Sequence, residues 1–228
     1  MNSGHDREKE SFTTLDDTRD SSSFRIITLE REYGCGAAGI AEKLATRLGW
    51  ILWDQRLTQE IARLAHSEKS VVEKREERRD PLYYRLFKSF ALGSYEGSPG
   101  VPVDALDADS IVRISEGVVE QAAATGNCVI VGRGSQHFLR TRSDTLRFFL
   151  YASREEKLRR LIAQGKTEAE AGVLVDTVDH ERAAFIKRYF HVEWPDRSVY
   201  HAMLNTAAGD DTVIRVILSF LELHQGAS

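Results

Sequence analysis

The segment from Arg25 to Ala41 constrains the fold of this chain more than any other. It begins with a short apolar run, passes through a stretch of small residues, and then takes on the spacing of a helix. Glycines let the backbone turn so that successive N–H groups point inward, and a helix N-terminus adds partial positive charge. This order predicts a phosphate-binding loop at Gly34–Gly39. Its candidate contact residues are Gly34, Cys35, Gly36, Ala37, Ala38, Gly39 and Ile40.

The loop departs from the usual phosphate-loop sequence, G-x-x-x-x-G-K-[ST]. Gly34 and Gly39 keep the glycine spacing, but Ile40 and Ala41 stand where lysine and serine or threonine belong. The positive charge and the metal-holding hydroxyl are therefore missing from the loop itself. Arg31, just before the loop, is the nearest candidate to replace that charge. A solvated surface arginine is the alternative interpretation.

Apolar strands alternate with helical patterns along the rest of the chain. Strands are predicted near residues 25–29, 50–53, 128–131, 146–151 and 201–205. This alternation is typical of a parallel sheet with crossover helices. We therefore predict an α/β three-layer sandwich, with a five-stranded parallel sheet and helices on both faces. It forms a single domain over residues 24–228, after a polar, disordered tail at residues 1–23.

Helix boundaries are marked by capping residues. Ser153 with Glu156, and Thr167 with Glu170, match the capping-box pattern. A long helix is expected near residues 170–190, and Asp210 or Asp211 is expected to cap a C-terminal helix.

The middle of the chain is less regular. A charged run is followed by aromatic residues, and helix is expected on both sides of Pro81. Residues 93–109 hold several glycines and prolines and are predicted to form a loop.

Composition narrows the possible partners and compartment. The net charge of −4 over 228 residues gives no support to general nucleic-acid binding. The sequence contains no apolar run of membrane-spanning length and no secretory signal pattern, so we expect no membrane partner. The two cysteines make no disulfide framework, which indicates a reducing, cytoplasmic setting. Histidine and cysteine spacing predicts no protein-held metal site.

Three blocks carry a resemblance to a known family. The first is I-T-L-E-R-E-Y-G-C-G at residues 27–36, which runs into L-W-D-Q-R-L at 52–57. The second is V-I-V-G-R-G at 129–134 with the strand that ends near Ala152 and the basic helix through Arg160. The third is D-H-E-R at 179–182 with the strand that follows. In order and spacing, these blocks resemble the cytidylate kinase-like family, a branch of the P-loop nucleoside monophosphate kinases.

The resemblance implies a fold and an activity. The expected reaction is ATP-dependent phosphoryl transfer to a nucleoside monophosphate, with CMP or dCMP as the expected acceptor. The implied cofactors are ATP and Mg²⁺, with the ion held mostly by nucleotide and water. Residues of about 55–108 would form the monophosphate-binding segment, and a helical lid would span about 153–190. The partners are nucleotide substrates, and the chain is expected to be a monomer or a homodimer.

The resemblance also implies site residues. Arg133 matches the arginine of a G-R-D motif that contacts the acceptor, while Gly134 replaces the aspartate of that motif. Asp54 matches a residue of the monophosphate site and can also cap a helix, and Arg56 is a weaker acceptor candidate. Arg31, Arg133 and Arg182 are the candidate catalytic residues.

The lid pattern D-x-x-R matches Asp179, a candidate substrate-binding residue, and Arg182. These two are expected to share one helix face and to pair. Val175 and Val178 stand where two lid arginines are expected. Lys187 and Arg188 are candidates to restore that charge.

Two alternatives remain open. The missing lysine and the thinned lid favour a catalytically degenerate nucleotide-binding regulatory module. Gly134 in place of aspartate favours a kinase of another small phosphate acceptor. One fold hosts many reactions, so the fold alone does not choose between them.

Overall fold

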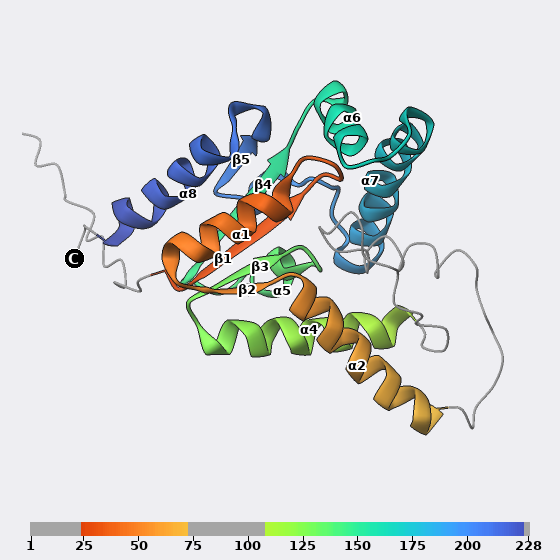
Figure 1. Cartoon of the computed structure of the whole chain (residues 1–228). Helices are drawn as coiled ribbons and strands as arrows, with labels where there is room; N and C mark the ends of the chain where they lie inside the picture. Colours follow the sequence, from red (N-terminus) through yellow and green to blue (C-terminus); the bar gives the residue numbers. More distant parts are fainter. Residues whose placement is uncertain (1–23, 73–107, 226–228) are drawn as a thin grey trace, which may run out of the picture.

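The computed structural model describes residues 24–72 and 108–225 (Figure 1). In chain order the first half holds β1 (Ile26–Arg31), α1 (Ala37–Leu48), β2 (Ile51–Trp53), α2 (Gln55–Val72) and α4 (Ala108–Thr125). The second half holds β3 (Cys128–Val131), α5 (Ser135–Phe138), β4 (Thr145–Tyr151), α6 (Arg154–Ala163), α7 (Glu168–Phe190), β5 (Ala202–Asn205) and α8 (Asp210–Gln225). Two short 3₁₀ turns, Arg197–Val199 and Thr206–Ala208, flank β5.

The five strands form one parallel sheet in the order β2-β3-β1-β4-β5. β1 is central, and all six of its residues are buried, because helices cover both faces of the sheet. The carboxyl ends of parallel strands meet at one edge, where ligands of open α/β sheets bind. This edge collects Arg31 at the end of β1, Asp54 after β2 and Arg133 after β3.

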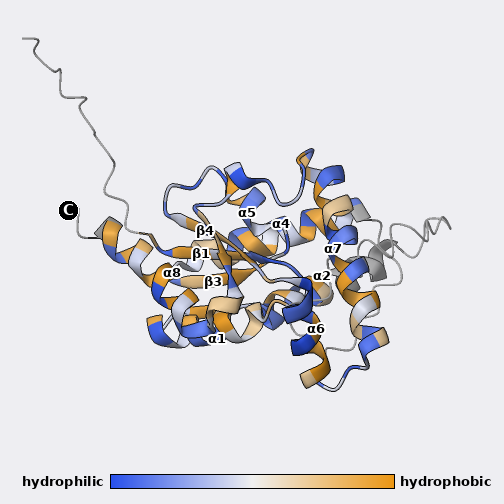
Figure 2. Cartoon of the chain, turned by 90° about the horizontal axis from the view of Figure 1, so that it is seen from above, coloured by the Kyte–Doolittle hydropathy of each residue, from blue (hydrophilic) through white to orange (hydrophobic). Residues whose placement is uncertain are grey.

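Alternate residues of β1 divide the core into two layers. Ile27 and Leu29 face α1 and α8, whereas Ile26 faces α2, α4 and the C-terminal part of α7. Figure 2 shows the apolar strands between helices whose outer faces carry hydrophilic residues. This arrangement confirms the predicted three-layer α/β fold with its five parallel strands.

A third, smaller cluster packs α6 and α7 against the loop that follows β1. It joins Tyr33 to Leu161 of α6 and to Ala171, Val175 and Val178 of α7. Val175 and Val178, where the resemblance implies lid arginines, are therefore packing residues. They hold α7 against α6 and the loop.

Most predicted boundaries agree with the structure to within a residue or two. The Thr167–Glu170 capping box forms as predicted, whereas at Ser153 the side chain accepts from the Glu156 N–H. Asp210 and Asp211 are not caps, because α8 begins at Asp210 and both lie in its first turn. Their carboxylates pair instead with Lys43 and Arg47 of α1. The short helix α5 was not predicted.

The predicted tail at residues 1–23, the helices around Pro81 and nearly all of the 93–109 loop lie outside the described residues. Within residues 24–72 and 108–225, no helix is long and apolar enough to cross a membrane.

Candidate active site

The loop between β1 and α1 has the backbone that its glycines predict. Gly34 and Gly36 have φ angles of 76° and 81°, a left-handed conformation that residues other than glycine rarely adopt. α1 begins at Ala37, so Ala37–Ile40 form its first turn and are not part of the loop proper. Gly36 occupies the N-cap position without a side-chain cap, which leaves the first N–H groups of α1 to other partners.

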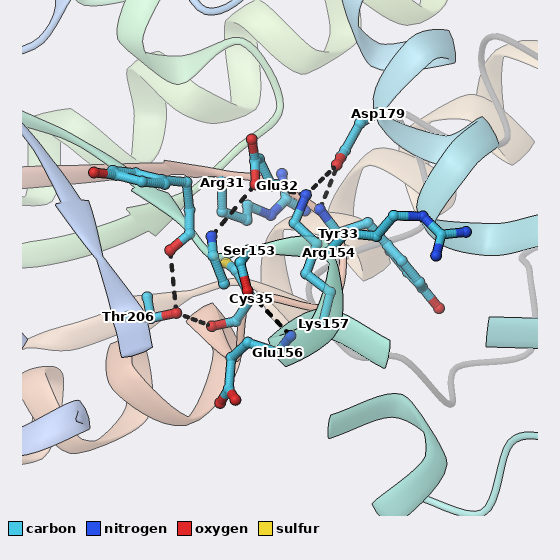
Figure 3. Close-up of polar contacts among 12 residues, drawn as sticks. Arg31, Glu32, Tyr33, Cys35, Ser153, Arg154, Glu156, Lys157, Asp179 and Thr206 are labelled. Carbon is cyan, nitrogen blue, oxygen red and sulfur yellow. Dashed lines mark hydrogen bonds and ion pairs between the residues drawn. The ribbon is translucent and has the colours of Figure 1, made fainter. Parts of the chain in front are cut away.

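Two basic residues of α6 lie against this loop. Lys157 of α6 is 2.5 Å from the Glu32 carboxylate and 3.2 Å from that of Asp179 (Figure 3). Burial alone would lower the pKa of Lys157, but the two carboxylates outweigh burial and raise it above its ordinary value. Lys157 therefore carries its charge beside a loop that lacks a lysine of its own.

Arg160 ties the loop to the segment after β5. Its guanidinium donates to the carbonyl of Cys35 and, at 3.0 Å, to both the hydroxyl and the carbonyl of Thr206. The Thr206 hydroxyl also donates to the Cys35 carbonyl at 2.7 Å. A Cβ on Gly36 would lie 2.5 Å from Arg160, so only glycine allows this approach. Burial raises the pKa of the Cys35 thiol to about 12, and the thiol stays protonated.

Three buried arginines meet at the carboxyl edge of the sheet. Arg31, Arg133 and Arg182 are each no more than 5% exposed. Burial, followed by repulsion from Arg31, lowers the pKa of Arg133 to about 9 and that of Arg182 to about 10. Burial on this scale is costly for like charges, and it is typical of a site built to receive an anion.

Carboxylates of the chain itself offset part of this charge. Glu30 Oε1 is 3.4 Å from Arg31 and Glu30 Oε2 accepts from Gln136 at 2.7 Å. Asp54 raises the pKa of Arg133, and Asp179 raises that of Arg182, although burial outweighs both effects.

Arg133, just after β3, has a φ of 62° between two left-handed glycines. This strained conformation is of the kind found at functional sites. Its guanidinium donates to the Thr58 hydroxyl at 2.6 Å. Asp54 is buried and directly precedes α2, which is the N-cap position. Arg56 lies over the Trp53 ring, 4.6 Å from its centroid, and is exposed.

At Gly134, where the resemblance implies an aspartate, the backbone and a neighbouring ring leave little room for a side chain. Gly134 has a φ of 72°, and a Cβ on it would lie 2.8 Å from the ring of Phe190. That ring stacks on His137 at 4.4 Å and meets Phe138 edge to face. Phe190, at the end of α7, thus fills the space that an aspartate side chain would take.

The structure brings most of the sequence-predicted residues together. Arg31 is buried, so its interpretation as a solvated charge is wrong, and Asp179 pairs with Arg182 at 3.2 Å as expected. Lys187 pairs with Glu193 in an exposed ion pair, and Arg188 lies over Tyr189, so neither replaces the lid charge at the loop.

The structure also places at the site several residues for which the sequence predicted no role, namely Glu30, Glu32, Thr58, Gln136, Lys157 and Thr206. Arg160 was predicted only as part of a basic helix. One available signal was the spacing of Lys157 and Arg160, which places both on one helix face. The others come from elements far apart in the chain, and their spacing carries no such signal.

Among residues 24–72 and 108–225, no group of three potential ligands from histidine, cysteine, aspartate and glutamate is placed to hold a metal ion.

The fold is an α/β three-layer sandwich with a glycine-rich loop and buried arginines at the carboxyl edge of its parallel sheet. The chain belongs to the cytidylate kinase-like family, whose sequence model matches residues 26–208. A comparison with curated proteins finds no match.

Three solved structures are similar to this chain at low sequence identity. An uncharacterized protein from Eubacterium ventriosum ATCC 27560 aligns with a TM-score of 0.60 at 17% identity, over 87% of this chain and 98% of its own. A shikimate kinase from Bacteroides thetaiotaomicron gives 0.49 at 17% identity, over 87% and 98%. The shikimate complex of shikimate kinase from Acinetobacter baumannii gives 0.47 at 18%, over 87% and 95%.

Proposed function

We propose that this chain transfers the γ-phosphoryl group of Mg-ATP to the phosphate of a nucleoside monophosphate, with CMP and dCMP as the first candidate acceptors. The observation that carries the proposal is the convergence of three buried guanidinium groups beside a glycine-rich loop. Guanidinium groups bind phosphate oxygens in a bidentate manner, and phosphoryl transfer requires mainly positioning and charge neutralisation.

Each group has a role in this reaction. The loop and the first turn of α1 hold the donor phosphates, and Arg133 with Asp54 positions the acceptor. An oxygen of the acceptor phosphate attacks the γ-phosphorus, and the bond from that phosphorus to the β–γ bridging oxygen breaks, so that ADP leaves with the electron pair. A monophosphate is largely dianionic at neutral pH, so this attack needs no general base. Arg31 and Arg182 offset the charge of the transition state.

The donor set fits a polyphosphate better than it fits a protein-held metal ion. Guanidinium and ammonium groups surround the loop, whereas Glu30, Asp54 and Asp179 face arginines. We propose that Mg²⁺ arrives with the nucleotide and keeps most of its water ligands.

The first experiment measures ADP formation from Mg-ATP across a panel of ribo- and deoxyribonucleoside monophosphates, with ATP binding measured in parallel. Acceptor-dependent turnover is expected. Absence of turnover with every acceptor, while ATP still binds, would contradict the proposal.

One observation favours a regulatory nucleotide-binding module as the second candidate. Side chains of the lid, Asp179 and Arg160, already contact the loop at Tyr33 and Cys35. A module that signals by opening and closing its lid would bind nucleotide tightly without turnover.

The close approach of Phe190 to Gly134 provides a prediction about folding stability. We expect Gly134→Asp, which restores the family motif, to lower the free energy of unfolding by about 1–3 kcal/mol, because of its left-handed φ and the Phe190 ring. Adding Phe190→Ala removes the steric part, so the double mutant should be less destabilised than the sum of the single mutants. Urea unfolding measures both effects.

Gly165→Asp is the matched control. Gly165 also has a positive φ, 93°, but no atom lies within 4 Å of its added Cβ. Gly165→Asp should lower the free energy of unfolding only by the backbone strain, and it should show no coupling to Phe190→Ala. Equal coupling at both glycines would show that Phe190 does not exclude the aspartate.

A further inference from the structure

The carboxylate of Asp179 lies at the phosphate-binding loop and has three partners. Its Oδ1 accepts from the backbone N–H of Tyr33 at 2.7 Å and from Arg182 Nη1 at 3.2 Å, and its Oδ2 accepts from Lys157 at 3.2 Å. Figure 3 shows Asp179 extending from α7 toward the loop. A backbone N–H of a glycine-rich loop, a guanidinium and an ammonium group form the donor set that a phosphate group takes.

This contact joins residues 146 positions apart in the sequence, so it is made by the packing of the lid. Apolar packing and a second hydrogen bond hold α7 in place at this contact. Val175 and Val178 seat α7 on the loop, and Arg182 donates to the Arg31 carbonyl at 3.1 Å. Asp176, about one turn earlier on α7, shows the contrast, because it pairs with Arg154 in an ion pair that is more than half exposed on both sides.

We propose that Tyr33 N–H, Lys157 and Arg182 form an oxyanion subsite for a nucleotide phosphate, and that Asp179 occupies this subsite as an internal substitute for the ligand. Lys157 thereby supplies from α6 the positive charge that the loop lacks. This inference rests on the proposed function for the identity of the ligand, but the subsite is tested without turnover.

Occupation by Asp179 has a consequence for affinity. A ligand that must displace an internal group binds more weakly. Its apparent Kd is its intrinsic Kd divided by the fraction of molecules in which the site is open. The incoming phosphate also releases the contact between α7 and the loop, so phosphate binding and lid position are coupled. Asp179 and the donor phosphate then compete for one anion site.

The experiment measures pyrophosphate binding to the full chain by titration calorimetry, without nucleotide or acceptor. Asp179→Ala vacates the subsite, and about tenfold tighter binding than in the parent chain is expected. Asp179→Asn removes the charge but keeps an oxygen that accepts from the Tyr33 N–H, so its gain should be clearly smaller. Asp176→Ala removes one negative charge from the same helix and should leave the affinity unchanged.

Comparing Asp179→Ala with Asp179→Asn separates the opening of the subsite from the simple loss of a negative charge. Equal gains in the two variants would overturn the proposal, because charge alone would then explain them. The double variant Asp179→Ala/Lys157→Ala should lose the gain, and a retained gain would overturn the role of Lys157.

A second measurement does not depend on how the variants fold. In the parent chain, saturating pyrophosphate should shift the amide resonance of Tyr33, since its N–H exchanges a carboxylate for a phosphate. An unmoved Tyr33 resonance in the presence of bound pyrophosphate would overturn the proposal. Failure of the kinase assay with a positive result here would remove the proposed catalysis and leave the subsite in place.

Discussion

Arg133→Met is expected to lower kcat/KM for the acceptor by about two to four orders of magnitude, while ATP binding stays near that of the parent. Hydrogen bonds to charged groups contribute about 1.5–3 kcal/mol each, and a bidentate phosphate contact has two of them. Each 1.4 kcal/mol corresponds to a factor of about ten. Steady-state kinetics with the acceptor varied, together with calorimetry of ATP binding, measures both quantities.

The stability of this variant separates lost chemistry from lost folding. The pKa of Arg133 is lowered by burial to about 9, so between about pH 9 and its ordinary value of 12.5 the unfolded chain binds more protons than the folded one. Stability therefore rises with pH across that window, and at pH 7 the full cost of the buried charge is present. Methionine removes that cost, so the variant should melt no lower than the parent.

Arg142→Met is the matched control for the kinetics. Arg142 pairs with Asp144 just before β4, at the amino edge of the sheet, opposite the candidate site. Its loss should leave kcat/KM unchanged. Comparable losses in the two variants, or unchanged kinetics in Arg133→Met, would contradict the role given to Arg133.

Gly132→Ala is expected to disrupt both folding stability and turnover. Gly132 has a φ of 64°, and a Cβ there would collide with the guanidinium of Arg31. The left-handed conformation costs alanine about 1–2 kcal/mol, and displacement of Arg31 adds to this cost. We therefore expect the free energy of unfolding, measured in urea, to fall by about 2–4 kcal/mol. A shift of about 1 Å in a positioning group typically costs about a hundredfold in rate, and kcat should fall accordingly.

Gly117→Ala controls for the substitution itself. Gly117 lies on the exposed side of α4, and no atom comes within 4 Å of an added Cβ. Alanine there should raise the free energy of unfolding by about 0.5–1 kcal/mol, because glycine is unfavourable within a helix. A Gly132→Ala protein as active as the parent would show that Arg31 is not held by this close approach.

The sequence by itself determined the layers of this protein. Residues 128–131 and 145–151 are apolar throughout or nearly so, as strands buried on both faces must be, and the fold follows from their alternation with helical spacing. Gly34 and Gly36 predicted the turn of the loop, because few other residues adopt its backbone. The helix at 168–190 was equally predictable from its capping box.

The positions of the candidate residues Arg31, Arg133 and Asp54 at one edge also follow from sequence order. Each stands at or just after the end of a predicted strand, and parallel strands end at the same edge. Burial was not predictable in the same way. A lone arginine has the same sequence signal whether it is solvated or enclosed, and only the packed neighbours decide.

Only the tertiary structure decided which basic side chains lie against the loop that lacks a lysine. Lys157 and Arg160 reach the loop because Val175, Val178 and Leu161 seat the two lid helices on Tyr33. Likewise, Phe190 excludes a carboxylate at Gly134 from the far end of α7. Such contacts join residues that are distant in the chain. Local propensity and spacing do not encode them, because they depend on how whole elements pack.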